Sequence, residues 1–386
     1  MTAMALEQPK LTIGFIPLVD CAVLAVAREQ GFAAREGLDL TLRPERSWAT
    51  IRDRLNIGEF DAAHMLAGMP IAASLGIAQA KVATIAPFSL NLNGNAITLS
   101  NALYGAMQDA AQEADLSQPA ASGAALAAVI AARRRLGKEP LTLAVVYPFS
   151  CHNYEMRYWL AAAGIDPDAD VRLIVIPPPL MAESLAQGQI DGFCVGEPWN
   201  SLAVERSIAR IVTTKADIWR SGPEKVLGLR ADWAQRNPRT LAALIRALYH
   251  AAAWAERPEN RTALAEMLAR PQYVGAPPSI IARALSGRLV PIKWGAPIAL
   301  DNFLVLHKQA ANFPWRSQAL WLYSQMVRWR QTRYSPEGAA VARACFRPDL
   351  YRQALADVTP RPVLPGASAK VEGALETPRH VGAAFP

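Results

Sequence analysis

The sequence of 386 residues lacks the features that mark several large classes of protein. Its four cysteines, Cys21, Cys151, Cys194 and Cys345, are too scattered for a disulfide framework and show no CxxC spacing for zinc. No stretch holds the roughly 20 uninterrupted apolar residues of a membrane helix, and the first residues show no basic segment followed by an apolar run. We therefore expect buried, reduced thiols, no metal, no membrane segment and a cytoplasmic location.

Motifs for catalysis are also missing. The five histidines are dispersed, and the sequence contains no HExxH, GxSxG, GxGxxG or phosphate-binding loop. A thiol stands beside an imidazole at Cys151 and His152, but neighbouring side chains on an extended segment point apart, which argues against a Cys–His nucleophile. We predict a protein that is not an enzyme and has no cofactor; an enzyme acting on a small heterocycle is the least favoured alternative.

The charge balance favours anions without indicating nucleic acid. A net charge of +7, spread over 386 residues, is a mild excess. Arginines and aromatic residues alternate over residues 315–334, but the helical spacing of Leu320, Tyr323 and Val327 favours an amphipathic helix with the arginines outside. We predict no direct contact with nucleic acid and leave the role of this segment open, including a surface for a protein partner.

An internal repeat indicates two similar lobes. The motif Leu-x-x-Gly-x-(Phe or Ile)-Asp-(Ala or Gly) occurs twice at a constant offset, which suggests two related α/β lobes with a ligand cleft between them. We interpret its aspartates as turn or capping residues, and His64 as either a core or a cleft-lining residue. The two copies comprise Leu55, Gly58, Phe60, Asp61 and Ala62, and Leu185, Gly188, Ile190, Asp191 and Gly192.

The order of the expected elements sets the domain boundaries. Short apolar segments alternate with helical ones, first from residue 11 and again from residue 141, as in a mainly parallel sheet flanked by helices. After residue 225 the pattern becomes predominantly helical, so the chain returns to lobe one, and its two crossovers form a hinge. We expect lobe one in 1–109 and 223–360, lobe two in 110–222, and an extended or disordered tail in 361–386.

Five positions at strand ends or crossovers could bind a ligand. Each alone has an ordinary explanation as a packed aromatic, a turn, a structural histidine or a surface lysine. Together their donors are cationic or neutral, which points to a small anion bound with micromolar affinity. They are Trp48, Asn93, His152, Gly196 and Lys225.

Several segments carry a family resemblance. They read GFIPLVDCAVLAVAREQGF, SWATIRDRLNIGEFDAAHMLAGMP, LNLNGNAITLS, HNYEMRYWLAAAGIDPD, DGFCVGEPWN and PEKVLG. The chain resembles the nitrate/bicarbonate-binding proteins of the NrtA and CmpA type, which have the type II periplasmic-binding-protein fold. The resemblance implies that Trp48, Asn93, His152 and Lys225 line an anion site. The family's nitrate binders commonly have a glutamine where Asn93 stands, so the shorter amide would withdraw its donor from the ligand.

The resemblance also implies a function. Transport members of the family carry an export signal, and the lack of one in this sequence makes it similar to cytoplasmic nitrate/nitrite sensors of the NasS type. Such sensors hold an RNA-binding antiterminator, NasT, until the anion binds. We therefore expect a sensor that sequesters a NasT-like antiterminator and releases it with nitrate or nitrite. The alternative is the solute-binding component of a nitrate or bicarbonate ABC importer.

Overall fold

The computed structural model describes residues 5–358, which form two compact units. Unit 1 holds the described residues of Met1–Leu92, Pro223–Pro278 and Val305–Leu375, and unit 2 holds those of Asn93–Gly222 and Ser279–Leu304. The predicted tail, 361–386, lies outside the described residues.

The helices and strands of unit 1 comprise β1 (Lys10–Phe15), η1 (Val19–Cys21), α1 (Ala22–Glu29), α2 (Phe32–Arg35), β2 (Asp39–Pro44), α3 (Trp48–Asn56), β3 (Ala62–Leu66), α4 (Met69–Leu75), β4 (Thr84–Asn93), β10 (Pro223–Arg230), α11 (Ala231–Arg236), α12 (Pro238–Glu256), η3 (Pro258–Asn260), α13 (Arg261–Ala269), α15 (Arg316–Arg328), α16 (Pro336–Cys345) and α17 (Pro348–Leu355).

Those of unit 2 comprise β5 (Asn95–Ser100), α5 (Asn101–Ala111), α6 (Pro119–Arg135), β6 (Leu141–Val145), α7 (Cys151–Ala162), β7 (Val171–Val175), η2 (Pro178–Leu180), α8 (Met181–Ala186), β8 (Gly192–Gly196), α9 (Trp199–Glu205), β9 (Ala209–Thr214), α10 (Lys215–Ile218), α14 (Pro278–Ser286), β11 (Arg288–Leu289) and β12 (Ile298–Ala299). The last strand, β13 (Leu304–Val305), lies where the chain re-enters unit 1.

The first crossing point differs from the expected one. The chain leaves unit 1 after residue 92 instead of residue 109, because β5 pairs with β8 and β9 of unit 2. The return after residue 222 coincides with the expectation, but 279–304 belongs to unit 2 instead of lobe one. These partners are about 100 residues away along the chain, so local patterns do not reveal them.

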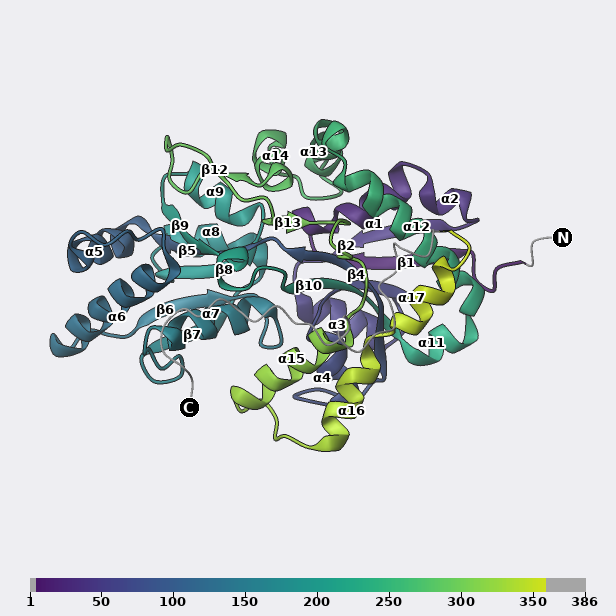
Figure 1. The fold of residues 1–386 in the computed structure, drawn as a ribbon, viewed down its shortest axis with the longest axis horizontal. Coiled ribbons are helices and arrows are strands. Elements are labelled where there is room, and N and C mark those ends of the chain that lie inside the picture. The colour runs from purple at the N-terminus through teal and green to yellow at the C-terminus, as the bar shows by residue number, and fades with distance from the viewer. Residues whose placement is uncertain (1–4, 359–386) are drawn as a thin grey trace. The chain divides into compact units, whose positions relative to one another are not determined.

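Each unit is built on a mixed sheet (Figure 1). The sheet of unit 1 includes the order β4-β10-β3-β1-β2, and the sheet of unit 2 runs β7-β6-β8-β5-β9. In both, three neighbouring strands are parallel and the next two pairings are antiparallel. The expected sheets are therefore present, but they are mixed instead of mainly parallel, because β10 and β5 enter each sheet against the direction of its parallel strands.

The repeat seen in the sequence is also a repeat of strand register. In unit 1 Ile13 lies opposite Ala62, and in unit 2 Leu143 lies opposite Gly192, which preserves the same offset between the two copies. The constant spacing of the repeat therefore corresponds to the register in which β1 pairs with β3 in unit 1 and β6 pairs with β8 in unit 2.

The two aspartates of the repeat make equivalent hydrogen bonds in the two units. Asp61 accepts the backbone N–H of Thr12 through its side chain at 2.8 Å, and Asp191 accepts that of Thr142 at 2.8 Å. In return, the backbone N–H of each aspartate donates to the carbonyl of the same threonine. The aspartates thus fasten the chain before the third strand to the first strand, a more specific role than the turn or cap that we expected.

The core of unit 1 forms where α12 packs against α1, α2 and α17 (Figure 1). Residues 22–27 of α1 are almost fully buried because alanine, valine and leucine alternate there without a charged residue. Among residues 5–358, no helix combines the length and the apolar character needed to cross a membrane.

The Arg- and Trp-rich segment forms α15, as its spacing predicts, but with a different buried face. Leu322, Tyr323 and Met326 are buried, whereas Leu320 and Val327 are partly exposed. The expected stripe was therefore assigned to the wrong face of the helix, although it correctly included Tyr323.

Candidate functional site

Trp48 brings an unsatisfied donor into the interior of unit 1. It is the first residue of α3, and the Ser47 side chain caps this helix by accepting the backbone N–H of Thr50 at 3.2 Å. The indole is 1% exposed, and its Nε1 has no hydrogen-bond partner among residues 5–358. A buried N–H without an acceptor costs about 1–3 kcal/mol, so this donor points to an acceptor supplied by a ligand.

Lys225 lies beside this indole on β10 and is fully buried. Its ammonium is 5.5 Å from the Trp48 ring centroid, 2.7 Å from Asp20 Oδ2 and 2.7 Å from Glu224 Oε1. Burial opposes the charge of Lys225, but the two carboxylates outweigh it, so the pKa of Lys225 lies above its usual value. Burial likewise opposes the charge of Asp20, and Lys225 outweighs it, so the pKa of Asp20 is lowered.

His64 completes the polar cluster of unit 1. Its Nδ1 accepts the backbone N–H of Ile16 at 3.4 Å, and its Nε2 lies 3.1 Å from Asp20 Oδ1. Burial lowers the pKa of His64 despite this carboxylate, so the ring is neutral and carries its hydrogen on Nε2. Of the two expected roles, the structure shows the core one, because His64 is fully buried in β3 and its ring lies tilted against that of Trp48, with the centroids 5.4 Å apart.

In unit 2, His152 lies in the first turn of α7. Ser150 caps this helix by accepting the backbone N–H of Asn153 at 3.0 Å. The extended segment that we expected here is therefore wrong, because the cap starts a helix at Cys151 directly after the turn. Successive residues of a helix are about 100° apart around its axis. The side chains of Cys151 and His152 therefore leave α7 in different directions because of helix geometry, and not because the segment is extended.

Glu155 and Lys215 form a buried ion pair in unit 2 that the sequence did not reveal. Lys215 Nζ lies 2.7 Å from Glu155 Oε1, and the Asn95 side chain donates to Glu155 Oε2 at 3.1 Å. The ammonium also lies 5.9 Å from the Trp219 ring centroid. Unit 2 thus matches unit 1 in combining a buried lysine, a carboxylate and a tryptophan.

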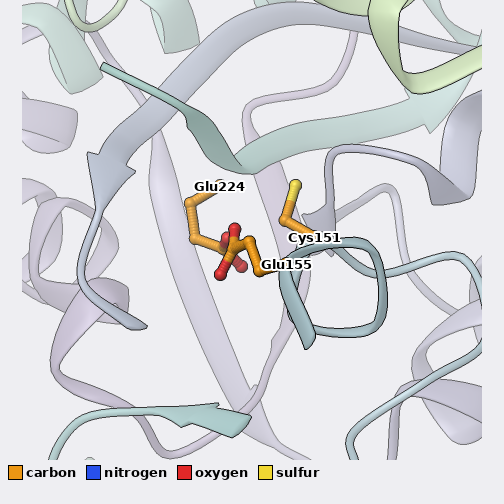
Figure 2. A group of neighbouring side chains, drawn as sticks. All are labelled: Cys151, Glu155 and Glu224. Carbon is orange, nitrogen blue, oxygen red and sulfur yellow. The ribbon is translucent and has the colours of Figure 1, made fainter. Parts of the chain in front are cut away.

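The signal for the missed carboxylates is present but weak. Cys151 and Glu155 leave α7 one helical turn apart, and Figure 2 shows both side chains. Glu224, also labelled there, belongs to β10 of unit 1 and directly precedes Lys225. Glu155 stands between Tyr154 and Met156, and Glu224 stands two residues before the apolar run 226–229, so the neighbouring residues are a weak sign that each carboxylate is buried.

Gly196 ends β8, where it lies opposite Asn95 of β5. The adjacent Glu197 is buried, accepts the backbone N–H of Ser201 at 3.2 Å through Oε2, and has no partner for Oε1 within the described chain. Burial raises the pKa of Glu197 to about 7. The end of β8 therefore carries a titratable acid that we did not expect.

Asn93 uses its side chain to hold unit 2 together. Its Nδ2 donates to the carbonyls of Arg220 at 2.7 Å and Asn302 at 2.8 Å, and its Oδ1 accepts the backbone N–H of Gly222 at 3.0 Å. The backbone of Asn93 is left-handed, with φ at 59°. Because both amide hydrogens are donated within unit 2, an anion would have to displace a structural contact; the ligand role of Asn93 stays a prediction.

The five expected residues fall into two groups. Trp48 and Lys225 meet in unit 1, while Asn93, His152 and Gly196 belong to unit 2. Their joint role in binding, and the cleft expected between the lobes, stay predictions that mutation can test.

The fold and these polar clusters define a class. The chain has the two-domain α/β fold of periplasmic binding proteins, and it is similar to the crystal structure of the periplasmic nitrate-binding protein NrtA from Synechocystis PCC 6803, with a TM-score of 0.85 and 28% identity over 94% of this chain and 92% of that one. The alkanesulfonate-binding protein SsuA from Xanthomonas axonopodis shares the fold at 15% identity and a TM-score of 0.61.

The chain belongs to the NMT1-like family, whose model matches residues 4–269. It is 33% identical to the nitrate/nitrite binding protein NrtA of Synechococcus elongatus over 90% of this chain and 78% of that protein. It is 37% identical to the nitrate import ATP-binding protein NrtC of Synechocystis and 38% identical to the bicarbonate transport ATP-binding protein CmpC of Synechococcus elongatus, over 90% and 84% of this chain. It spans about half the length of these two relatives, 50% and 46%.

Proposed function

We propose that the protein is a solute-binding protein for nitrate or nitrite and serves as the binding component of an ABC importer. One observation carries this proposal: the buried, unpartnered indole N–H of Trp48 lies beside the Lys225 ammonium. The relatives support it, because they are named as nitrate-binding or as nitrate and bicarbonate transport proteins.

The chemistry of nitrate suits these groups. Nitrate and nitrite carry one negative charge and only accept hydrogen bonds, while the Trp48 indole and the Lys225 ammonium only donate them. The ammonium has three hydrogens, and its two carboxylate partners engage two of them. A charge-assisted hydrogen bond contributes about 1.5–3 kcal/mol, so a few such contacts are enough for micromolar affinity.

Bicarbonate is the second ligand to test. It differs from nitrate in carrying an O–H donor, which needs an acceptor, and the Asp20 carboxylate beside Lys225 is such an acceptor within unit 1. The bicarbonate transport protein CmpC among the relatives gives the same reason to include it.

Calorimetry tests the binding proposal. Purified protein is titrated with nitrate, nitrite, bicarbonate and sulfate, and we expect micromolar binding of nitrate or nitrite. Trp48→Phe keeps the ring but removes the N–H, and we expect it to weaken binding about tenfold. Trp254→Phe, on a partly exposed face of α12, serves as the matched control and should leave the affinity unchanged. The absence of heat with both nitrate and nitrite would reject the proposal, and heat with bicarbonate alone would favour the second ligand.

The sensor function expected from the sequence, with its NasT-like antiterminator and cytoplasmic location, is our second proposal. The named relatives are transport proteins and therefore favour the importer. Cell fractionation and co-purification separate the two. A cytoplasmic protein whose bound antiterminator is released by nitrate supports the sensor, whereas a protein outside the cytoplasm that raises nitrate uptake supports the importer.

A further inference from the structure

We propose that Asp20 is a positioning residue of the anion site, which holds the Lys225 ammonium beside the Trp48 indole so that both groups donate to one anion. The Asp20 carboxylate only accepts hydrogen bonds, so it acts on nitrate or nitrite through Lys225 and not by contact. This inference rests on the proposed function, because it concerns the same two donors.

Asp20 divides its two oxygens between two buried partners. Its Oδ2 lies 2.7 Å from Lys225 Nζ, and its Oδ1 lies 3.1 Å from His64 Nε2. All three side chains are at most 4% exposed. A lysine ammonium stands at the end of a flexible stem, so its position depends on the groups that hold it. Because Asp20 is itself held at its other oxygen, it offers Lys225 an acceptor in a fixed place.

His64 is held in turn by the backbone. The N–H of Ile16 donates to His64 Nδ1 at 3.4 Å, which leaves the ring hydrogen on Nε2, the atom nearest Asp20 Oδ1. The ring also lies against Trp48, with the centroids 5.4 Å apart. The same imidazole therefore contacts the indole and orients the carboxylate that holds the ammonium, so one side chain relates the two donors to each other.

Asp20 also keeps the ammonium charged. Burial lowers the pKa of Lys225, and the carboxylates of Asp20 and Glu224 together raise it above its usual value, with the larger effect from Asp20. Removing the charge of Asp20 should therefore bring the pKa of Lys225 down. A neutral amine would lose its charge-assisted hydrogen bond to the anion, which is roughly twice as strong as a neutral one.

A simpler explanation is that Asp20 and His64 only stabilise the fold of unit 1. A purely structural role would alter the unfolding free energy of a variant. It would not make the affinity of a folded variant depend on whether Lys225 is charged. The pH profile of binding therefore distinguishes positioning from support.

The first test measures nitrate affinity by calorimetry at pH 7 and pH 9.5, with nitrite in its place if the wild type binds only nitrite. Asp20→Asn keeps the shape of the side chain and removes its charge. We expect its affinity to be about tenfold below that of the wild type at pH 7, and about threefold lower still at pH 9.5, because Lys225 is then partly neutral. Asp39→Asn, at an exposed position of β2 in unit 1, should match the wild type at both pH values.

The second test leaves Asp20 unchanged. His64→Gln retains an N–H that can donate to Asp20 Oδ1, whereas His64→Leu has a similar volume without one. We expect His64→Gln to bind nitrate about fivefold more tightly than His64→Leu. Thermal unfolding of each protein establishes that it is folded.

The outcomes separate this inference from the proposed function. A wild type that binds neither nitrate nor nitrite rejects the proposed function itself. Where the wild type binds, unchanged affinity in folded Asp20→Asn overturns the positioning role alone, as does a loss that is equal at both pH values. If Asp20→Asn does not fold, the two His64 variants decide: equal affinities overturn the inference, and tighter binding by His64→Gln supports it.

Discussion

Asn93 and Gly222 are joined by two reciprocal hydrogen bonds. The backbone N–H of Asn93 donates to the Gly222 carbonyl at 3.0 Å, and the Gly222 N–H donates to Asn93 Oδ1 at 3.0 Å. These residues are the first and the last of the long segment Asn93–Gly222 of unit 2. Asn93 therefore closes this segment on itself, and its predicted role in binding has to be separated from that structural one.

Asn93→Ala should destabilise the protein by on the order of 2–4 kcal/mol, because it orphans three backbone groups and puts alanine at a left-handed φ, which asparagine tolerates better. Urea unfolding measures this loss. Asn101→Ala removes a single exposed hydrogen bond, to the Ser207 carbonyl, and should cost less than about 1 kcal/mol. If Asn93→Ala keeps its stability but loses nitrate affinity, the side chain serves the ligand instead.

Lys225→Ala should be both unstable and unable to bind nitrate. It removes the ammonium that Asp20 and Glu224 share in the interior, which costs about 3–5 kcal/mol of unfolding free energy. Urea unfolding and nitrate calorimetry on the same sample measure the two effects. Lys81→Ala, an exposed lysine of unit 1, is the control. A fully stable Lys225→Ala would contradict the ion cluster described for unit 1.

His152→Ala should weaken nitrate binding by about 1.5–3 kcal/mol if the imidazole donates to the anion. Calorimetry at constant pH provides the measurement, with unfolding in urea as a check on the fold. His250→Ala, at an exposed position of α12, should bind as the wild type does. An unaltered affinity in folded His152→Ala would remove this residue from the site.

Glu197 should make stability fall as pH rises from about 4.5 to about 7. Its pKa in the folded protein is about 7, against 4.5 for the ordinary side chain, so the folded state binds more protons in this window. The stabilisation from the protonated Glu197 is complete below pH 4.5, the pKa of the side chain in the unfolded chain. It is lost as the pH rises through about 7, the pKa in the folded protein, and the total loss is about 3 kcal/mol.

Glu197→Gln isolates this contribution from other titrating groups, including His64, whose lowered pKa gives the opposite slope. Urea unfolding measures both proteins at pH 5 and pH 8. Between these two pH values the wild type should lose about 3 kcal/mol of unfolding free energy relative to Glu197→Gln. Parallel profiles for the two proteins would show that Glu197 titrates normally.

Asp61→Ala and Asp191→Ala should have similar costs, because each aspartate fastens a first strand in its own unit. Each loses one charge-assisted bond to a backbone N–H and leaves that N–H without its partner, which costs about 1.5–3 kcal/mol. Asp61→Ala also loses the bond from the Gln8 side-chain amide at 2.8 Å, so its cost should lie at the upper end of this range. Urea unfolding compares them with Asp109→Ala, an exposed residue of α5. Markedly unequal losses of unfolding free energy would mean that the two units share the strand register of the repeat but do not depend equally on its aspartate.

Local patterns predicted the repeated scaffold well. The spacing of the two aspartate motifs anticipated two α/β units, and the two motifs end at Ala62 and Gly192, where β3 and β8 begin. These features depend on turns, caps and periodicity, which lie within a few residues of each other. The start of α7 was missed because Ser150 acts as a helix cap only when the chain bends after β6, and the short polar segment gave no periodicity.

The candidate site was predicted only in part. Trp48 and Lys225 were chosen separately, and the structure places the ammonium 5.5 Å from the indole ring centroid. Asp20, Glu155 and Glu224 were not chosen, because an isolated acidic residue resembles a surface residue until its lysine partner is known. The pairing of β10 with β3 and β4 buries Lys225 within the sheet of unit 1.

The sequence by itself determined the two-unit α/β plan and the family, because these are set by short repeated motifs and by side-chain periodicity. Only the tertiary structure decided where unit 2 begins and which charges share the interior. The first depends on β5 pairing with strands about 100 residues away. The second depends on contacts such as Lys225 with Asp20, separated by about 200 residues. Long-range register and burial set both, and they leave at most a weak local signal in the sequence.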